Sequence, residues 1–502
     1  MSATNLASLL VDSARERPQR TAIRLDDVEV SYQQIDEGTA RVAAMLKTKG
    51  VAPGDRVGIM LPNVPHFALA YYGVLRAGGV VVPMNVQLKS REVSFYLSDA
   101  DARLMLVWHE VAEAAEHGAA ETGTEVITVI PGEFEKLLAQ GEADTDLVEC
   151  AGDDTAVILY TSGTTGKPKG AELTHDNLLK NARVSSALAE TGEEDVVLGA
   201  LPLFHSFGQT CGLNATLSVG GCISMIPRFA PDKALEIIQR DRVTVFQGVP
   251  TMFTAMLHYE GSEDIDTSSL RLCMSGGSAM PVEVMQGFEK AFDCKVLEGY
   301  GLSETSPVAS FNHPDRERKP GSIGTPIDGV EIKVLDEDGQ EVDHGEVGEL
   351  AIRGHNVMKG YWKRPDATEE AIVDGWFHTG DLGKVDEDGY FSIVDRKKEM
   401  IIRGGYNVYP REIEEVFYEH PAVLEVAVVG IPDEKMGEEV GAAVVLKKDQ
   451  KVDEAELKAY IKDEVAGYKY PRRIWFVDEL PKTATGKILK REVEPPASTS
   501  AS

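Results

Sequence analysis

The sequence predicts an α/β protein in which a large N-terminal domain of parallel-sheet layers and a small β-barrel-like part precede a smaller α+β C-terminal domain. Short runs of Val, Ile and Leu recur between amphipathic segments, and such runs are typical of strands buried on both faces of a parallel sheet. From about Gly321 the pattern changes to alternating strands joined by acidic turns. The 502 residues are also enough for more than one domain.

The predicted elements follow one another in a regular order along the chain. Buried parallel strands are predicted at residues 56–60, 103–107, 125–130, 222–226, 243–246 and 270–274. The segments GVEIKVLDEDGQEV and GKVDEDGYFSIV predict hairpins, and after them come a helix at 412–419, strands at 423–430 and 441–447, and a helix at 454–465. We therefore divide the chain into an N-terminal domain at 1–395, a C-terminal domain at 396–494 and a disordered tail at 495–502.

One long segment, between Asp195 and Arg228, has no charged side chain. It contains Pro202, His205 and Asn214, so it lacks the roughly 20 continuous apolar residues that a membrane-spanning helix needs. The segment predicts a core helix that lines an apolar cavity.

The composition excludes several kinds of partner and compartment. Lys and Arg total 51 against 82 Asp and Glu, a net charge of −31, so nonspecific binding of nucleic acid by phosphate neutralisation is excluded. The first twenty residues lack the features of a secretory signal. The five scattered cysteines suit buried thiols in a reducing compartment, so we expect a cytoplasmic protein.

The strongest local motif is TSGTTGKPKG, which directly follows the apolar run TAVILY. Its glycines permit close backbone approach, its hydroxyls are short donors and its lysines are positive, a combination that favours a phosphate cradle over a solvated turn. A Walker loop is excluded because proline follows the Gly-Lys pair. The residues of this candidate cradle are Thr161, Ser162, Gly163, Thr164, Thr165, Gly166 and Lys167.

The segment YTSGTTGKPKGAELTH resembles the phosphate loop of the adenylate-forming superfamily, which comprises acyl-CoA synthetases, adenylation domains and luciferases. The resemblance continues in the family order through LPLFHSFG, SGGSAM, EGYGLSET, GWFHTGDLG, DRKKEMIIRGGYNVYP and PKTATGKILKR. It implies a mobile C-terminal domain and a reaction in two halves. A carboxylate first attacks the α-phosphorus of ATP and expels pyrophosphate, and a thiol then displaces AMP from the acyl-adenylate.

The resemblance also implies a nucleotide site. Tyr300 would stack on adenine, Ser303 would contact phosphate, and Asp381 and Arg396 would contact the ribose. Glu304, together with Thr161, would hold Mg²⁺, a hard cation that suits oxygen ligands. Further ATP or AMP contacts are implied for Gly277, Ser278, Gly299 and Gly301.

Lys487 corresponds to the family's catalytic lysine, and His205 to a residue beside the acyl carboxylate. The nearby cations Lys482, Lys490 and Arg491 are expected to be solvated or to contact CoA phosphates. The hinge is implied at Asp395 and Lys398 and the CoA channel at Gly404 and Gly405. The acyl pocket is implied at Phe204, Val249, Gly276 and Met280.

The resemblance therefore implies that the chain is an AMP-forming acid–thiol ligase that uses ATP, Mg²⁺ and CoA. Apolar and small residues near the expected pocket favour a medium- or long-chain fatty acid, with an aryl acid of the 4-coumarate kind as the alternative. Three rivals share the motifs: a stand-alone adenylation enzyme that loads a carrier protein, a noncatalytic binding protein, and a luciferase-like oxidase. The sequence also allows weak peripheral contact with a membrane. It is compatible with either a monomer or a homodimer.

Overall fold

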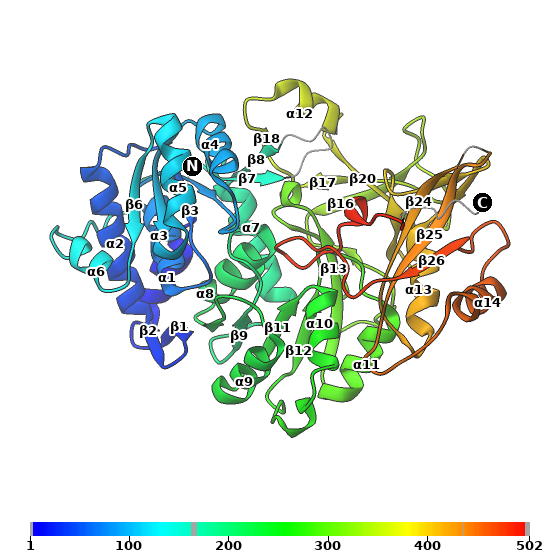
Figure 1. Ribbon diagram of the computed structural model, residues 1–502. Helices are drawn as coiled ribbons and strands as arrows, with labels where there is room; N and C mark the ends of the chain where they lie inside the picture. The colour runs from blue at the N-terminus through cyan, green and yellow to red at the C-terminus, as the bar shows by residue number, and fades with distance from the viewer. Residues whose placement is uncertain (1–3, 162–167, 434, 497–502) are drawn as a thin grey trace.

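The computed structural model describes residues 4–161, 168–433 and 435–496. Two large sheets and the helices between them form the N-terminal two thirds of the chain, coloured blue to green in Figure 1. The first sheet has seven strands, of which the last five in the order below, from β7 to β6, are parallel. In spatial order these strands are β18 (Gly360–Tyr361), β8 (Lys169–Thr174), β7 (Thr155–Thr161), β4 (Val80–Pro83), β3 (Arg56–Met60), β5 (Ala102–Trp108) and β6 (Glu125–Val129).

The second sheet has nine strands, with a parallel core and antiparallel edges. The order is β15 (Thr325–Pro326), β14 (Val308–Phe311), β13 (Lys295–Gly301), β12 (Leu272–Ser275), β11 (Val245–Gly248), β9 (Val196–Gly199), β10 (Cys222–Met225), β1 (Thr21–Leu25) and β2 (Val28–Ser31). Parallel strands buried on both faces explain the unalternated apolar runs of the sequence. The expected strands at 243–246 and 270–274 start two residues later than predicted, at Val245 and Leu272.

Helices pack on both faces of each large sheet. One hydrophobic core lies between the sheets and contains apolar side chains of α1, α2, α3 and α7, while separate cores lie under α4 and α5 and under α9, α10 and α11. The bounds are α1 (Ser8–Glu16), α2 (Tyr32–Thr48), α3 (Pro65–Arg76), α4 (Ser90–Asp99), α5 (Ala112–Thr122), α6 (Glu133–Leu138), α7 (His175–Leu188), α8 (Ala215–Ser218), α9 (Pro231–Asp241), α10 (Pro250–Leu257) and α11 (Val282–Phe292).

The uncharged segment of the sequence folds into the nine-stranded sheet and its covering layer. It forms β9, a π-helix at Phe207–Asn214, α8 and β10, and the residues of the π-helix after Phe207 are buried. The expected core helix is therefore present, although its hydrogen bonding is of the π type, which is frequent at functional sites. Among the described residues, no helix is both long and apolar enough to cross a membrane.

The predicted hairpins form a third, antiparallel sheet of five strands, with β21 pairing beside β20. Its strands are β16 (Val330–Leu335), β17 (Gly348–Gly354), β20 (Trp376–Val385), β19 (Ile372–Val373) and β21 (Phe391–Arg396), and α12 (Pro365–Ala371) precedes β19. A hydrophobic cluster that includes Val334, Leu350 and Leu297 packs this sheet against the nine-stranded one. The third sheet thereby fixes Asp381 and Arg396 near the end of β13.

Residues from Ile401 onward build a fourth sheet, which we call the C-terminal unit (orange and red in Figure 1). Its strands are β23 (Tyr406–Val408), β22 (Ile401–Arg403), β25 (Gly437–Leu446), β24 (Val423–Asp433) and β26 (Arg473–Phe476), with helices α13 (Pro410–Glu419) and α14 (Glu454–Glu464). After β26 the chain leaves this sheet and extends toward α10 and β13, as the red segment of Figure 1 shows. This excursion carries Lys487 into the N-terminal part of the molecule.

Candidate active site

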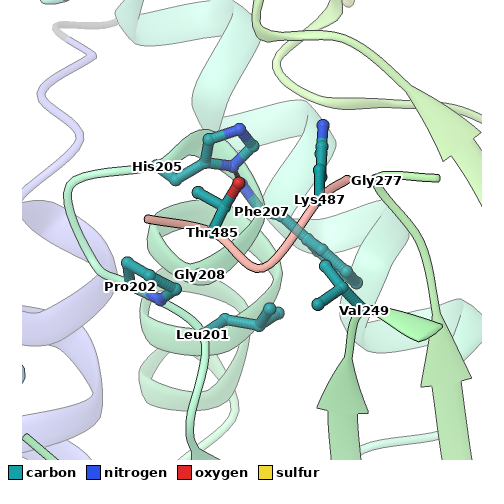
Figure 2. A pocket seen from close by; sticks show the side chains of 9 residues that line it. All are labelled: Leu201, Pro202, His205, Phe207, Gly208, Val249, Gly277, Thr485 and Lys487. Atoms are coloured by element: carbon teal, nitrogen blue, oxygen red, sulfur yellow. Dashed lines mark hydrogen bonds between the residues drawn. The ribbon is translucent and has the colours of Figure 1, made fainter. Parts of the chain in front are cut away.

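A small pocket lies where the end of the chain meets the π-helix and the C-terminal ends of β11 and β12. In Figure 2 the side chains of His205, Thr485 and Lys487 gather at one end of this pocket, and Leu201 and Pro202 lie at the other. The carboxyl ends of parallel strands are the usual place for a ligand in an α/β sheet. The lining residues are Leu201, Pro202, His205, Phe207, Gly208, Val249, Gly277, Thr485 and Lys487.

A tight turn presents Lys487 to the pocket. The backbone N–H of Thr483 donates to the carbonyl of Lys487 at 2.8 Å, and the N–H of Lys487 donates to the Thr483 hydroxyl at 3.1 Å. Gly486 has a positive φ of 83°, which glycine adopts without strain. The hydroxyl of Thr251 on α10 donates to the Gly486 carbonyl at 2.9 Å and so fastens the turn to the N-terminal part.

The side chain of Lys487 lies directly against Gly277. A Cβ on Gly277 would stand 3.0 Å from Cε of the lysine, and its φ of +82° also favours glycine. Burial, followed by the nearby guanidinium of Arg396, lowers the pKa of Lys487 to about 8. Asp381 and Glu304 act in the opposite direction, so the ammonium form is favoured wherever these carboxylates are charged.

His205 faces the same pocket as a neutral imidazole. Its Nδ1 accepts a hydrogen bond from the backbone N–H of Phe207 at 3.3 Å, which leaves the proton on Nε2. Desolvation, and then the ammonium of Lys487, lower the pKa of His205 to about 3. The ring is therefore an uncharged donor near the lysine and is not a general base poised near neutral pH.

Tyr300, Asp381 and Arg396 form a connected group beside the pocket. The phenol of Tyr300 donates to Asp381 Oδ2 at 2.6 Å, and Arg396 Nε lies 3.3 Å from Oδ1. Asp381 and Arg396 are register neighbours on β20 and β21, and the Thr379 hydroxyl accepts from the N–H of Asp381. Burial raises the pKa of Asp381 above its ordinary value. Asp381 is 6% exposed, whereas the Arg396 side chain is 58% exposed and free to contact a ligand.

Glu304 is held by two hydroxyl groups that bind the same carboxylate oxygen. Thr161 donates to Oε1 at 3.2 Å and Tyr361 donates to Oε1 at 3.0 Å. The ammonium of Lys169 lies 5.0 Å from the ring centroid of Tyr361. Among the described residues, no hydrogen bond engages Oε2 of Glu304, so this donor set fits a hard cation that takes carboxylate oxygen.

The phosphate cradle is described only at its two ends. Strand β7 ends at Thr161 and β8 begins at Lys169, and these two residues pair across the ladder. The predicted cradle residues that lie outside the described part of the chain are Ser162, Gly163, Thr164, Thr165, Gly166 and Lys167.

The other predicted nucleotide residues lie on the neighbouring loops and strand ends. Ser278 is exposed on the loop after β12, Ser303 lies in the 3₁₀ turn that carries Glu304, and Gly299 and Gly301 flank Tyr300 on β13. Three of them are therefore immediate neighbours of Tyr300 or Glu304 along the chain.

The predicted acyl-pocket residues are not all at the pocket. Val249 lines it, and Gly276 packs on Phe207, with a Cβ at Gly276 standing 3.0 Å from the ring. Phe204 is half-buried and does not line this pocket, and Met280 is fully buried in the core cluster under α10 and α11.

Asp395 joins the third sheet to the C-terminal unit. Its carboxylate accepts from the N–H of Arg396 at 2.7 Å and from the N–H of Arg411 on α13 at 3.0 Å. Lys398 is exposed just beyond it. Gly404 and Gly405 are exposed, have positive φ and form the turn between β22 and β23, and neither lines the described pocket.

The environments of the three cations near Lys487 agree only in part with the prediction that they are solvated or contact CoA phosphates. Lys490 is not solvated, because its ammonium pairs with Glu414 at 2.8 Å and its side chain is only 18% exposed. Lys482 pairs with Glu425 at 2.7 Å. Arg491 is 69% exposed, as expected. Lys490 is therefore part of the packing between α13 and the last segment of the chain.

Several site residues were not predicted from the sequence. Thr485 lies in the same motif as Lys487, and Phe207 lies in the motif that contains His205, so both positions could have been inferred. Thr251 and Tyr361 carry no such signal. Tyr361 reaches Glu304 because β18 pairs with β8 at the edge of the seven-stranded sheet.

Comparison with known proteins gives consistent matches over the length of the chain. The profile of the AMP-binding enzyme family matches residues 10–362, and that of the AMP-binding enzyme C-terminal domain matches residues 412–487. A long-chain-fatty-acid–CoA ligase of Bacillus subtilis (strain 168) is 39% identical over 524 aligned residues, which cover 97% of this chain and 94% of the relative. A feruloyl-CoA synthase of Amycolatopsis sp is 39% identical over 492, covering 97% and 98%.

Solved structures match the fold as well. ATP-bound MatB from Rhodopseudomonas palustris superposes with a TM-score of 0.91 at 35% identity, over 98% of both chains. A benzoate CoA ligase from Burkholderia xenovorans LB400 has a TM-score of 0.91 at 32% identity, over 97% of this chain and 99% of that one.

Proposed function

The chain belongs to the AMP-binding enzyme family, and on this premise we propose that it converts a carboxylic acid and ATP to an acyl-adenylate and pyrophosphate, and then transfers the acyl group to the thiol of CoA with release of AMP. One observation carries the proposal. Lys487 lies in one pocket with His205, and the carboxylates of Asp381 and Glu304 raise the pKa of the lysine. A noncatalytic protein would have no need to bury an ammonium at this place.

The first half-reaction must bring two anions together, the carboxylate and the α-phosphate. Lys487 is half-buried and supplies a positive charge at the pocket, where an ammonium stabilises developing negative charge. The Nε2–H of neutral His205 is placed to donate to the acid's carboxylate without adding a competing positive charge. Lys487 thus supplies the charge, and His205 orients the acid.

The nucleotide is held by groups on the second and third sheets. Asp381 accepts from ribose hydroxyls, Arg396 donates to the same part of the ligand, and Tyr300 packs beside adenine with its phenol fixed on Asp381. Mg²⁺ bound at Glu304 would neutralise phosphate charge as pyrophosphate leaves. Thr161 and Tyr361 orient the Glu304 carboxylate so that one oxygen stays available.

The second half-reaction needs the thiol to reach the carbonyl carbon that Lys487 now covers. We propose that the C-terminal unit turns about the segment at Asp395 and Lys398, which withdraws Lys487 and brings the turn at Gly404 and Gly405 to the CoA channel. The exposure and positive φ of these glycines support close approach of a ligand to the backbone.

The relatives support both classes of acid. Two equally similar relatives are named for a long-chain fatty acid and for ferulate, so the overall identity of 39% does not separate a fatty acid from an aryl acid. We keep the medium- or long-chain fatty acid and the aryl acid as the two candidates. We propose CoA as acceptor because the relatives of both classes are named for CoA.

Measurement of pyrophosphate release tests the proposal. The purified protein is assayed with ATP and Mg²⁺ against straight-chain C4 to C18 acids, 4-coumarate, malonate and amino acids, each with and without CoA. We expect acid-dependent release and a CoA thioester detected by mass spectrometry. Release without a CoA-dependent product would indicate a carrier protein as acceptor, and no release with any acid would refute the proposal.

A further inference from the structure

Buried polar atoms without partners are concentrated on the wall beneath the pocket. In the described part of the chain, thirteen buried side-chain nitrogen or oxygen atoms have no hydrogen-bond partner. Five of them lie on the π-helix, the residue before it, or the adjacent strand ends of β11 and β12: Ser206, Gln209, Thr210, Gln247 and Ser275. Such atoms are rare in folded proteins because leaving them unpaired costs free energy, so their concentration at one place points to a polar ligand.

Two of these residues stand just before residues that line the pocket. Gln247 and Ser275 lie near the ends of β11 and β12, two positions before Val249 and Gly277. Val249 and Gly277 line the pocket. Gln247 therefore lies about 7 Å from Val249 along the extended chain.

The amide of Gln247 is enclosed between β11 and the π-helix, and its oxygen has no hydrogen-bond partner among the described residues. Its Nε2 donates to the carbonyl of Cys211 at 3.1 Å, which fixes the orientation of the amide. Oε1 faces Gly212, where a Cβ would stand 3.7 Å away. Gln247 is 3% exposed, so bulk water does not satisfy this oxygen. Gly212 follows Phe207 and Gly208 on the π-helix, and these two line the pocket.

We propose that Gln247 is a specificity-determining residue of the acyl pocket, whose amide oxygen accepts a hydrogen bond from a hydroxyl at the far end of the acid. This inference rests on the proposed acid-activating function. The spacing of about 7 Å beyond the level of Val249 suits one aromatic ring with a hydroxyl opposite the carboxylate-bearing chain. The preferred acids are thus hydroxylated aryl acids, and an unsubstituted hydrocarbon chain leaves Gln247 unpaired.

The selectivity follows from the free-energy cost of leaving the buried amide oxygen without a hydrogen bond. A site that is built to hydrogen-bond a hydroxyl rejects the analogue lacking it far more strongly than an apolar pocket rejects an added methylene. We therefore expect kcat/KM for 4-hydroxycinnamate to exceed that for cinnamate by about tenfold or more. The same order is expected for 10-hydroxydecanoate over decanoate if the chain reaches Gln247.

The test compares these two pairs of acids in the wild type, in Gln247→Met and in Gln239→Met, with the CoA thioester as product. Gln247→Met keeps the side-chain volume and removes the acceptor, so the preference for 4-hydroxycinnamate should fall to about onefold. Gln239→Met is the control, since it makes the same change of side chain on the exposed face of α9, where the amide oxygen of Gln239 already accepts from the N–H of Asp266 at 2.7 Å. Its preference should match that of the wild type.

The outcomes separate the two proposals. A wild type that forms thioesters of cinnamate or decanoate at least as well as those of their hydroxylated partners refutes the role of Gln247 and leaves the ligase function intact. An unchanged preference in Gln247→Met also refutes it. Absence of any thioester or pyrophosphate refutes the proposed function itself. If Gln247→Met does not fold, the comparison of acids in the wild type still decides.

Discussion

The phenol of Tyr361 donates a 3.0 Å hydrogen bond to Oε1 of Glu304, the oxygen that also receives the hydroxyl of Thr161. Thr161 lies at the end of β7 and Tyr361 on β18, the two strands that flank β8 at the edge of the seven-stranded sheet. Each bond restricts rotation of the carboxylate. The second oxygen is thereby kept in a fixed direction for a cation.

Replacing Tyr361 with Phe should weaken the cation site without unfolding the protein. We expect the Mg²⁺ concentration for half-maximal pyrophosphate release to rise about tenfold, since one hydrogen bond to a charged group contributes about 1.5 kcal/mol. Binding of Mn²⁺ in the presence of a nonhydrolysable ATP analogue, measured by electron paramagnetic resonance, should weaken in parallel. Tyr160→Phe is the control, because Tyr160 donates to Asp99 and does not bind Glu304. Equal effects of both variants would contradict the assignment.

Replacing Lys487 with Ala should separate the two half-reactions. Adenylate formation should fall by about 10² to 10³, because a buried charge aimed at developing negative charge is lost. Thioester formation from a supplied acyl-adenylate should stay within about threefold of the wild type. Lys482→Ala, a change in the same motif at a lysine that pairs with Glu425, should spare both steps. An equal loss of both steps in Lys487→Ala would contradict the assignment of Lys487 to adenylate formation alone.

Replacing Thr251 with Val should loosen the turn that presents the lysine. The lost hydrogen bond to the Gly486 carbonyl is worth about 1 kcal/mol, so adenylate formation should slow about fivefold. The second half-reaction should be unchanged or faster, since the C-terminal unit leaves this contact. Single-turnover kinetics with each half-reaction started separately would check this. A slower thioester step in Thr251→Val would be inconsistent with a contact that belongs to the first arrangement only.

Glu298 makes the stability of the protein depend on pH. It is 1% exposed, its Oε1 accepts from the N–H of Met280, and burial raises its pKa from 4.5 to about 7. The folded state therefore binds more protons than the unfolded state between pH 4.5 and about 7, so this group's contribution to stability falls as pH rises through that window.

Glu298→Gln keeps the acceptor for Met280 and removes the titration. The variant should be more stable than the wild type at pH 8, by roughly 1–3 kcal/mol, and similar to it at pH 5. Urea unfolding at both pH values, followed by circular dichroism, measures the difference. A constant difference across this range would show that Glu298 does not titrate on unfolding.

Much of the fold could be predicted because apolar runs and acidic turns are local features of the chain. The run at 56–60 is β3 and the run at 423–430 is the start of β24. The strand starts at Val245 and Leu272 were displaced because apolar residues continue into the preceding loops, where Thr244 binds Asp195 and Leu270 packs in the core.

The site was harder to predict where it depends on distant pairing. Lys487, Asp381 and Glu304 belong to recognisable motifs, whereas Tyr361 reaches Glu304 across 57 residues and Thr251 reaches Gly486 across 235. Gln247 lies just after the strand predicted at 243–246, and only the packing of the π-helix against it shows that its amide oxygen has no partner. These contacts are set by how sheets and loops pack, which local sequence does not encode.

The position of Lys487 in the chain has a consequence for biosynthesis. The two large sheets are complete once Tyr361 has been made, and domains generally fold as units during synthesis, N-terminal first. The groups expected at the nucleotide, from Thr161 to Arg396, therefore precede the lysine by at least 91 positions along the chain. A nascent chain would therefore contain the residues of its ATP site before it contains Lys487. Formation of the acyl-adenylate, a reactive mixed anhydride, would become possible only after Lys487 has been added.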